Sequence, residues 1–182
     1  TGDIGRYHDS IIRPPAVFPQ ADFIICESTY GNRIHPPQQE SEKILQSIVL
    51  ETCAFKKGKL VIPAFSLGRT QEIVLALNNI KNKGLLPPVK VYVDSPLSVS
   101  VTELMRRYTT AFNDEIASLL KTDADPFDFP GLTYIRDVAE SKKLNDMEEP
   151  CIIISASGMA EAGRIKRHIK NNISEKRNPI LL

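Results

Sequence analysis

Short apolar runs recur along the chain and predict buried β-strands. They are rich in β-branched residues and show little polar alternation, which is typical of strands covered on both faces. Polar or turn-forming residues bound each run. The predicted strands are residues 23–26, 59–64, 89–93, 132–135 and 151–154, with the start of another at residues 180–182.

Helical periodicity fills most of the sequence between these runs. Asp94-Ser95-Pro96 is a helix start signal, because a capping side chain precedes a proline in the first turn. The predicted helices are residues 38–57, the segment around Ile73, Val74 and Leu77, residues 97–108, 112–121 and 138–145, and a last helix with Ile165, Ile169 and Ile173 as its core stripe.

This alternation of strands and helices predicts an α/β fold. We expect a mostly parallel, doubly wound sheet in three layers, with helices on both faces. Ligands of such sheets bind at the carboxyl ends of the strands. The predicted strands that end at residues 64, 93 and 154 run into turns of small or capping residues. These turns are therefore the expected binding site.

The turn after residue 154 has the composition of an anion site. Ser155, Ala156, Ser157 and Gly158 are all small, so their backbone N–H groups and hydroxyls can approach a ligand, and a helix follows with Arg164 near its start. The alternative is that these residues serve only the strand-to-helix connection that every parallel α/β protein needs.

Apolar residues also occupy the loop at residues 123–131, where Phe127 and Phe129 stand between prolines. A plain linker is more polar than this. We expect the loop to act as a lid or as a plug over the core, and a partner surface is the alternative.

Composition narrows the choice of ligand. The 182 residues carry 23 Lys and Arg against 22 Asp and Glu, a formal net charge of +1, so a polyanion must be held locally. Cys26, Cys53 and Cys151 lack metal-type spacing, and we expect buried free thiols in a reducing compartment, the cytoplasm. No apolar run is long enough to cross a bilayer.

Several common sites are absent from the sequence. It has neither the G-x-G-x-x-G dinucleotide motif nor the G-x-x-x-x-G-K-[ST] phosphate loop. His8, His35 and His168 are too scattered for a histidine-rich zinc site, and we expect each at the solvated surface. Glu27, directly after the first predicted strand, is either a loop cap or a site residue in a cleft.

Five ordered motifs together resemble one family, the β-CASP branch of the metallo-β-lactamase superfamily, and its RNA-processing members in particular. These members include the cleavage-and-polyadenylation endonuclease subunit and its bacterial and archaeal relatives. The resemblance implies a partial metallo-β-lactamase-type segment at residues 1–31 and a β-CASP domain at residues 32–182. The motifs begin at Thr1 (TGDIG), Glu27 (ESTYG), Pro63 (PAFSLGRTQE), Asp94 (DSP) and Ser155 (SASGM).

The resemblance also assigns roles to residues. Asp3 matches the aspartate that bridges two zinc ions, and Glu27 matches the acidic residue that approaches the metal site. The family's cleft-facing loops correspond to Ser66, Arg69, Ser155, Ser157 and Gly158, and from turn chemistry we expect these loops, together with Arg164, to contact phosphates. The family's His-x-His-x-Asp-His motif would precede Thr1, and its later histidines would follow Leu182. The sequence is thus expected to be part of a longer protein and to lack most zinc ligands.

The first hypothesis is that this sequence is the substrate clamp of a zinc-dependent ribonuclease that hydrolyses phosphodiester bonds in single-stranded RNA. The isolated segment is expected to be inactive and to retain no zinc. The expected partners are RNA, the missing metallo-β-lactamase domain and, as a further candidate, a second copy of the chain. Two alternatives are a non-catalytic RNA-binding or assembly subunit and a stand-alone phosphate-binding α/β domain.

Overall fold

A parallel four-stranded sheet forms the centre of the computed structural model, which describes residues 2, 4–34 and 38–182. The strands stand in the order β1-β4-β2-β3, and all neighbours pair in parallel. The last of these four strands in sequence order therefore lies inside the sheet, between the first two. The strands are β1 (Lys59–Pro63), β2 (Lys90–Asp94), β3 (Leu132–Ile135) and β4 (Cys151–Ser155).

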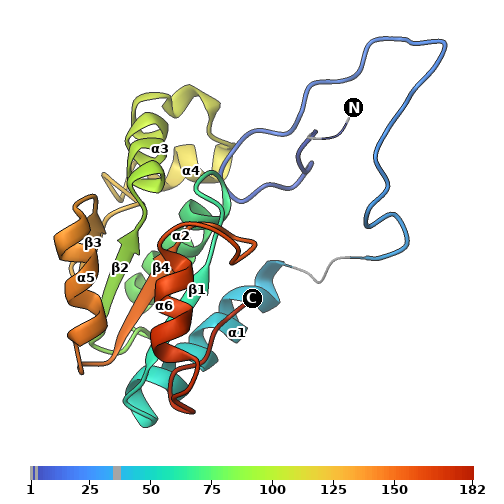
Figure 1. Ribbon diagram of the computed structural model, residues 1–182. Helices are drawn as coiled ribbons and strands as arrows, with labels where there is room; N and C mark the ends of the chain where they lie inside the picture. Colours follow the sequence, from blue (N-terminus) through green and yellow to red (C-terminus); the bar gives the residue numbers. More distant parts are fainter. Residues whose placement is uncertain (1, 3, 35–37) are drawn as a thin grey trace.

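Helices cover both faces of this sheet, with α5 and α6 in front of it and α2 behind it in Figure 1. The predicted three-layer α/β fold is confirmed. Residues 38–55 form one continuous helical segment that ends in a π-helical turn. The helices are α1 (Gln38–Val49), η1 (Leu50–Phe55), α2 (Arg69–Asn82), α3 (Pro96–Arg107), η2 (Thr109–Ala111), α4 (Asp114–Leu119), α5 (Val138–Asp146) and α6 (Ile165–Asn172).

Alternation along each strand divides the core into two layers. Leu60 and Ile62 of β1 belong to a large apolar cluster with residues of α1 and α2. Ile153 of β4 belongs to a smaller cluster with Leu144 of α5. Every residue of β1 and β4 is buried. These strands contain the uninterrupted apolar runs because they are covered on both sides.

The loop at residues 123–131 is a plug. Phe127 and Phe129 are buried in the larger cluster, and the rings of Phe127 and Phe112 lie 5.9 Å apart. The hydroxyl of Tyr134 donates a hydrogen bond of 2.6 Å to the carbonyl of Phe127. The loop therefore completes the core beside α4.

The strand predicted at residues 23–26 is wrong. Residues 13–34 run as an irregular segment away from the sheet (Figure 1), and no described strand pairs with residues 23–26. Phe23 is 91% exposed and Ile25 is 86% exposed, while Cys26 is also exposed instead of buried. An apolar run alone does not make a strand, because a strand also needs a ladder of backbone hydrogen bonds to a neighbouring strand. The predicted domain boundary after residue 31 stays a prediction.

The core stripe predicted for the last helix is partly wrong. Ile165 is fully buried, but Ile173 is exposed and His168 is only 1% exposed. The buried face of α6 is therefore turned toward His168 and Asn172, and the prediction of a solvated His168 is wrong. The predicted strand at residues 180–182 forms only an isolated bridge from Ile180 to Val61 of β1.

Two further observations concern the whole described chain. Cys53 and Cys151 are buried free thiols, as predicted. No helix among the described residues has the length and apolar character needed to cross a membrane.

Candidate functional site

The turns after β1, β2 and β4 meet at one edge of the sheet, because these strands are adjacent and parallel. The hydroxyl oxygens of Ser66 and Ser95 lie 3.4 Å apart. The backbone N–H of Ala64 donates to the carbonyl of Ser155 at 3.0 Å. Residues 64–69, 94–96 and 155–164 thus form a single surface, here called the carboxyl edge.

The predicted small turn residues differ in their accessibility at this edge. Ser155 is buried, and its hydroxyl donates to the carbonyl of Asp94 at 2.7 Å, so it ties β4 to β2. Ser157 and Gly158 are half-buried. A Cβ atom at Gly158 would lie 2.7 Å from the Phe65 ring, so only glycine allows the two turns to pack this closely. A loop of nine residues separates Ser155 from α6, and the small turn is therefore not itself the helix N-terminus.

Arg69 stands in the first turn of α2, where Glu72 holds it. The Nη1 atom of Arg69 lies 3.0 Å from Glu72 Oε2, and Arg6 pairs with the same carboxylate. The side chains of Arg69 and Arg6 remain 58% and 54% exposed. Arg6 also lies 3.6 Å from Asp9 Oδ2, so two carboxylates balance the two cations, and the exposed guanidinium groups keep N–H donors that face solvent. The sequence did not single out Glu72, although its i,i+3 spacing from Arg69 was a signal for the pair.

Gln71 fixes the turn that carries Ser66. Its buried side-chain amide donates to the carbonyl of Ser66 at 3.2 Å and to the hydroxyl of Thr102 at 2.9 Å. Its Oε1 accepts a hydrogen bond of 2.9 Å from the backbone N–H of Gly68. The turn is therefore held in place by α2 and α3 before any ligand arrives.

A buried charge cluster lies under the carboxyl edge, on the face covered by α5 and α6. Asp94, at the end of β2, is fully buried. Its Oδ2 lies 2.6 Å from His168 Nε2 and accepts a hydrogen bond of 2.6 Å from Ser141 Oγ, while its Oδ1 lies 2.7 Å from Arg164 Nη1. Burial raises the pKa of Asp94, but the hydrogen bonds with His168, Ser141 and Arg164 outweigh that effect and hold the pKa below its ordinary value.

Arg164 therefore has a structural partner at the predicted site. Its second nitrogen donates to the carbonyl of Arg136 at 2.7 Å, and its side chain is 19% exposed. His168 is a member of this cluster that sequence reasoning placed at the surface. Its Nδ1 is buried with no hydrogen-bond partner among the described residues.

The two acidic residues predicted near the metal have different outcomes. Asp3 lies outside the described residues. Glu27 is exposed, and its carboxylate accepts a hydrogen bond of 2.7 Å from the backbone N–H of Thr29, which lowers the pKa of Glu27. The structure thus shows Glu27 as the cap of its own loop. Within the described part of the chain, no group of three or more His, Cys, Asp or Glu side chains could hold a metal ion.

Comparison with known proteins gives a family match over most of the chain. Residues 70–182 match the Beta-Casp domain. The whole chain is 32% identical to ribonuclease TTHA0252 of Thermus thermophilus and covers 41% of that protein. It is 31% identical to transcription termination factor FttA of Methanosarcina mazei, of which it covers 29%. It is also 31% identical to cleavage and polyadenylation specificity factor subunit 3 of Dictyostelium discoideum, of which it covers 23%. The chain thus spans less than half the length of these relatives.

Proposed function

This chain belongs to the β-CASP family, and we propose that it forms the RNA-clamping domain of a metal-dependent ribonuclease. One structural observation carries the proposal. Arg69 and Arg6 present two exposed guanidinium groups at the carboxyl edge, where both pair with Glu72 and Arg6 also pairs with Asp9. Guanidinium groups bind phosphate oxygens in a planar, bidentate geometry.

In the proposed clamp, the two arginine side chains are already held in place before RNA binds. Glu72 limits the freedom of both arginines before RNA arrives, so less side-chain entropy is lost on binding. The half-buried Ser157 and Ser66 lie in the neighbouring turns, where hydroxyl groups can donate to the same phosphate backbone. Holding the backbone at several points would orient the scissile bond relative to the catalytic groups.

We propose zinc as the metal of the parent protein, with Asp3 among its ligands and Glu27 near it. The resemblance to metallo-β-lactamase enzymes supports this assignment. The described residues do not themselves provide a metal site, so no step of the hydrolysis is assigned to them. Their proposed contribution is to bind and orient the RNA.

The test uses the full-length parent protein and its Arg69→Ala variant. We expect the parent to cleave single-stranded RNA, and the variant to bind RNA more weakly, with a salt dependence of binding that is shallower by about 0.7 in log–log slope per lost phosphate contact. Arg107→Ala is the matched control, because Arg107 is an exposed arginine in the last turn of α3. Binding is measured by fluorescence anisotropy at several salt concentrations.

The outcomes separate the competing hypotheses. Unchanged binding by the Arg69→Ala variant would contradict the clamp. A parent that binds RNA without cleaving it, with zinc supplied, would favour the non-catalytic subunit. A parent that binds inorganic phosphate but no RNA would favour the stand-alone phosphate-binding domain.

A further inference from the structure

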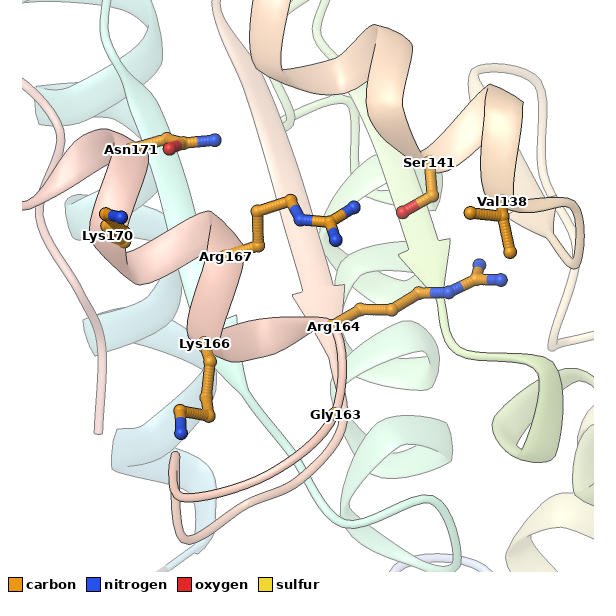
Figure 2. A pocket seen from close by; sticks show the side chains of 8 residues that line it. All are labelled: Val138, Ser141, Gly163, Arg164, Lys166, Arg167, Lys170 and Asn171. Carbon is orange, nitrogen blue, oxygen red and sulfur yellow. The ribbon is translucent and has the colours of Figure 1, made fainter.

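A second basic surface lies between α5 and α6, on the sheet face that contains the Asp94 cluster. Val138 and Ser141 of α5 line one side of this groove. Arg164, Lys166, Arg167 and Lys170, at and within α6, contribute to the other side. Figure 2 shows Arg164 and Arg167 extending from α6 toward α5, whereas Lys166 points away from it.

Three of these cations have no acidic partner. Lys166, Arg167 and Lys170 form no ion pair with any described carboxylate, and none of the residues that line the groove is acidic. Lys166 and Lys170 are four residues apart on the helix, a spacing at which like charges repel. The helix dipole favours Lys170 in the last turn of α6 but disfavours Lys166 and Arg167 in the first turn. These two unpaired charges do not stabilise the helix, which favours an anionic ligand as their partner.

Arg164 gives the groove a fixed positive group. Asp94 and the carbonyl of Arg136 hold its guanidinium from below, and its side chain is still partly open to the groove. Arg167 follows one helical turn later, and its guanidinium has no hydrogen-bond partner in the described chain. One anchored and one free guanidinium on the same side of a helix suit successive phosphates of an extended strand.

We infer that the groove between α5 and α6 binds the sugar–phosphate backbone of RNA as a second contact region, which extends the carboxyl edge from Arg164 along α6. This inference rests on the proposed function for the choice of RNA as the polyanion. The two regions adjoin at the end of β2, because Asp94 holds Arg164 in the groove while the next residue, Ser95, lies beside Ser66 at the carboxyl edge. A long RNA would then contact both regions, and a short RNA only the edge.

The experiment compares oligouridylates of about 6 and about 20 nucleotides, lengths on either side of common single-strand site sizes. The full-length parent is compared with its Arg167→Ala/Lys170→Ala variant. The matched control is Lys142→Ala/Lys143→Ala, which removes two exposed charges from α5 that do not line the groove. Arg164 is left intact because it stabilises buried Asp94.

We expect the groove variant to bind the long RNA roughly tenfold more weakly near 0.1 M salt, with a log–log salt slope shallower by about 1.4 for two lost phosphate contacts. Binding and cleavage of the short RNA should not change. Equal weakening by the control would overturn the inference, because it would show a general charge effect. Equal binding of the long RNA by variant and parent would overturn it as well.

Failure of the proposed function has a different signature. A parent that cleaves neither RNA, but loses long-RNA binding in the groove variant alone, would overturn the ribonuclease assignment and support the groove. If the parent cleaves both RNAs and the groove variant binds them as tightly as the parent does, the ribonuclease assignment is supported and the groove is overturned. No RNA binding by the parent would overturn both.

Discussion

Asp94 is the residue whose environment depends most on distant parts of the chain. Its partners Ser141, Arg164 and His168 lie on α5, just before α6 and on α6, between 47 and 74 residues away. No local pattern marks these contacts, so the sequence predicted only that Asp94 precedes a helix start. A buried carboxylate needs partners to offset its desolvation, and this need explains why His168 is buried while Ile173 is exposed.

Replacing Asp94 by Asn should therefore destabilise the fold. Removing the charge leaves Arg164 without its carboxylate, and breaking such a buried pair costs on the order of 3 kcal/mol in the free energy of unfolding. The pKa of Asp94 is lowered in the folded state, so its contribution is complete above the ordinary value of about 3.9 and is lost as the pH falls through the folded value. Urea unfolding of the unsubstituted protein and of the Asp94→Asn variant, at pH 7 and at pH 3, measures this difference in the free energy of unfolding.

We expect the stability gap between the two proteins to narrow at pH 3. Asp128→Asn serves as the control, because Asp128 is exposed and its substitution should change the free energy of unfolding by less than about 0.5 kcal/mol. A gap of the same size at both pH values would show that Asp94 does not act through its charge.

At the scale of elements, the loop between β4 and α6 folds back on itself. The backbone N–H of Ile165 donates to the carbonyl of Ala156 at 3.2 Å, and Gly163 has a φ of +75°. A Cβ atom at Gly163 would stand 2.5 Å from the oxygen of Ala156. Close backbone packing therefore places Arg164 over Asp94, and the small residues of this segment serve the fold as well as any ligand.

Comparing Gly163→Ala with Gly84→Ala separates the cost of a left-handed backbone conformation from the cost of a steric clash. Both glycines have similar positive φ values, +75° and +71°, but a Cβ at Gly84 would meet no atom within 4 Å. Gly84→Ala should cost about 1 kcal/mol for the left-handed backbone alone. Gly163→Ala should cost at least about 1 kcal/mol more, because it adds a steric clash. Equal losses in urea unfolding would mean that the loop relaxes without strain.

At the scale of the whole molecule, the alternation of apolar runs and helical periods was enough to predict the parallel sheet and the edge at which the turns after β1, β2 and β4 meet. The same reasoning failed at residues 23–26, because it measures apolar character and not the presence of a pairing strand. It also missed Glu72 as the residue that joins Arg6 to Arg69, since that contact spans 66 residues. Patterns predict elements, but contacts between elements require the assembled structure.

The purified 182-residue chain should bind RNA without cleaving it. Its described residues supply cationic groups at the carboxyl edge and in the α5–α6 groove, but no cluster able to hold a metal. A gel assay of a labelled oligouridylate with added zinc, run beside the full-length parent as positive control, measures this. Zinc-dependent cleavage by the 182-residue chain, abolished by a chelator, would contradict the expectation.

The position of β4 in the sheet has a consequence for protein synthesis. β4 leaves the ribosome after β1, β2 and β3, yet it separates β1 from β2 in the sheet. Until residue 155 has emerged, β1 lacks its neighbour among the four described strands and β2 can pair with β3 alone, so apolar surface that is later buried stays open to water. Nascent chains in this state are prone to aggregate, and general chaperones would protect them during that interval.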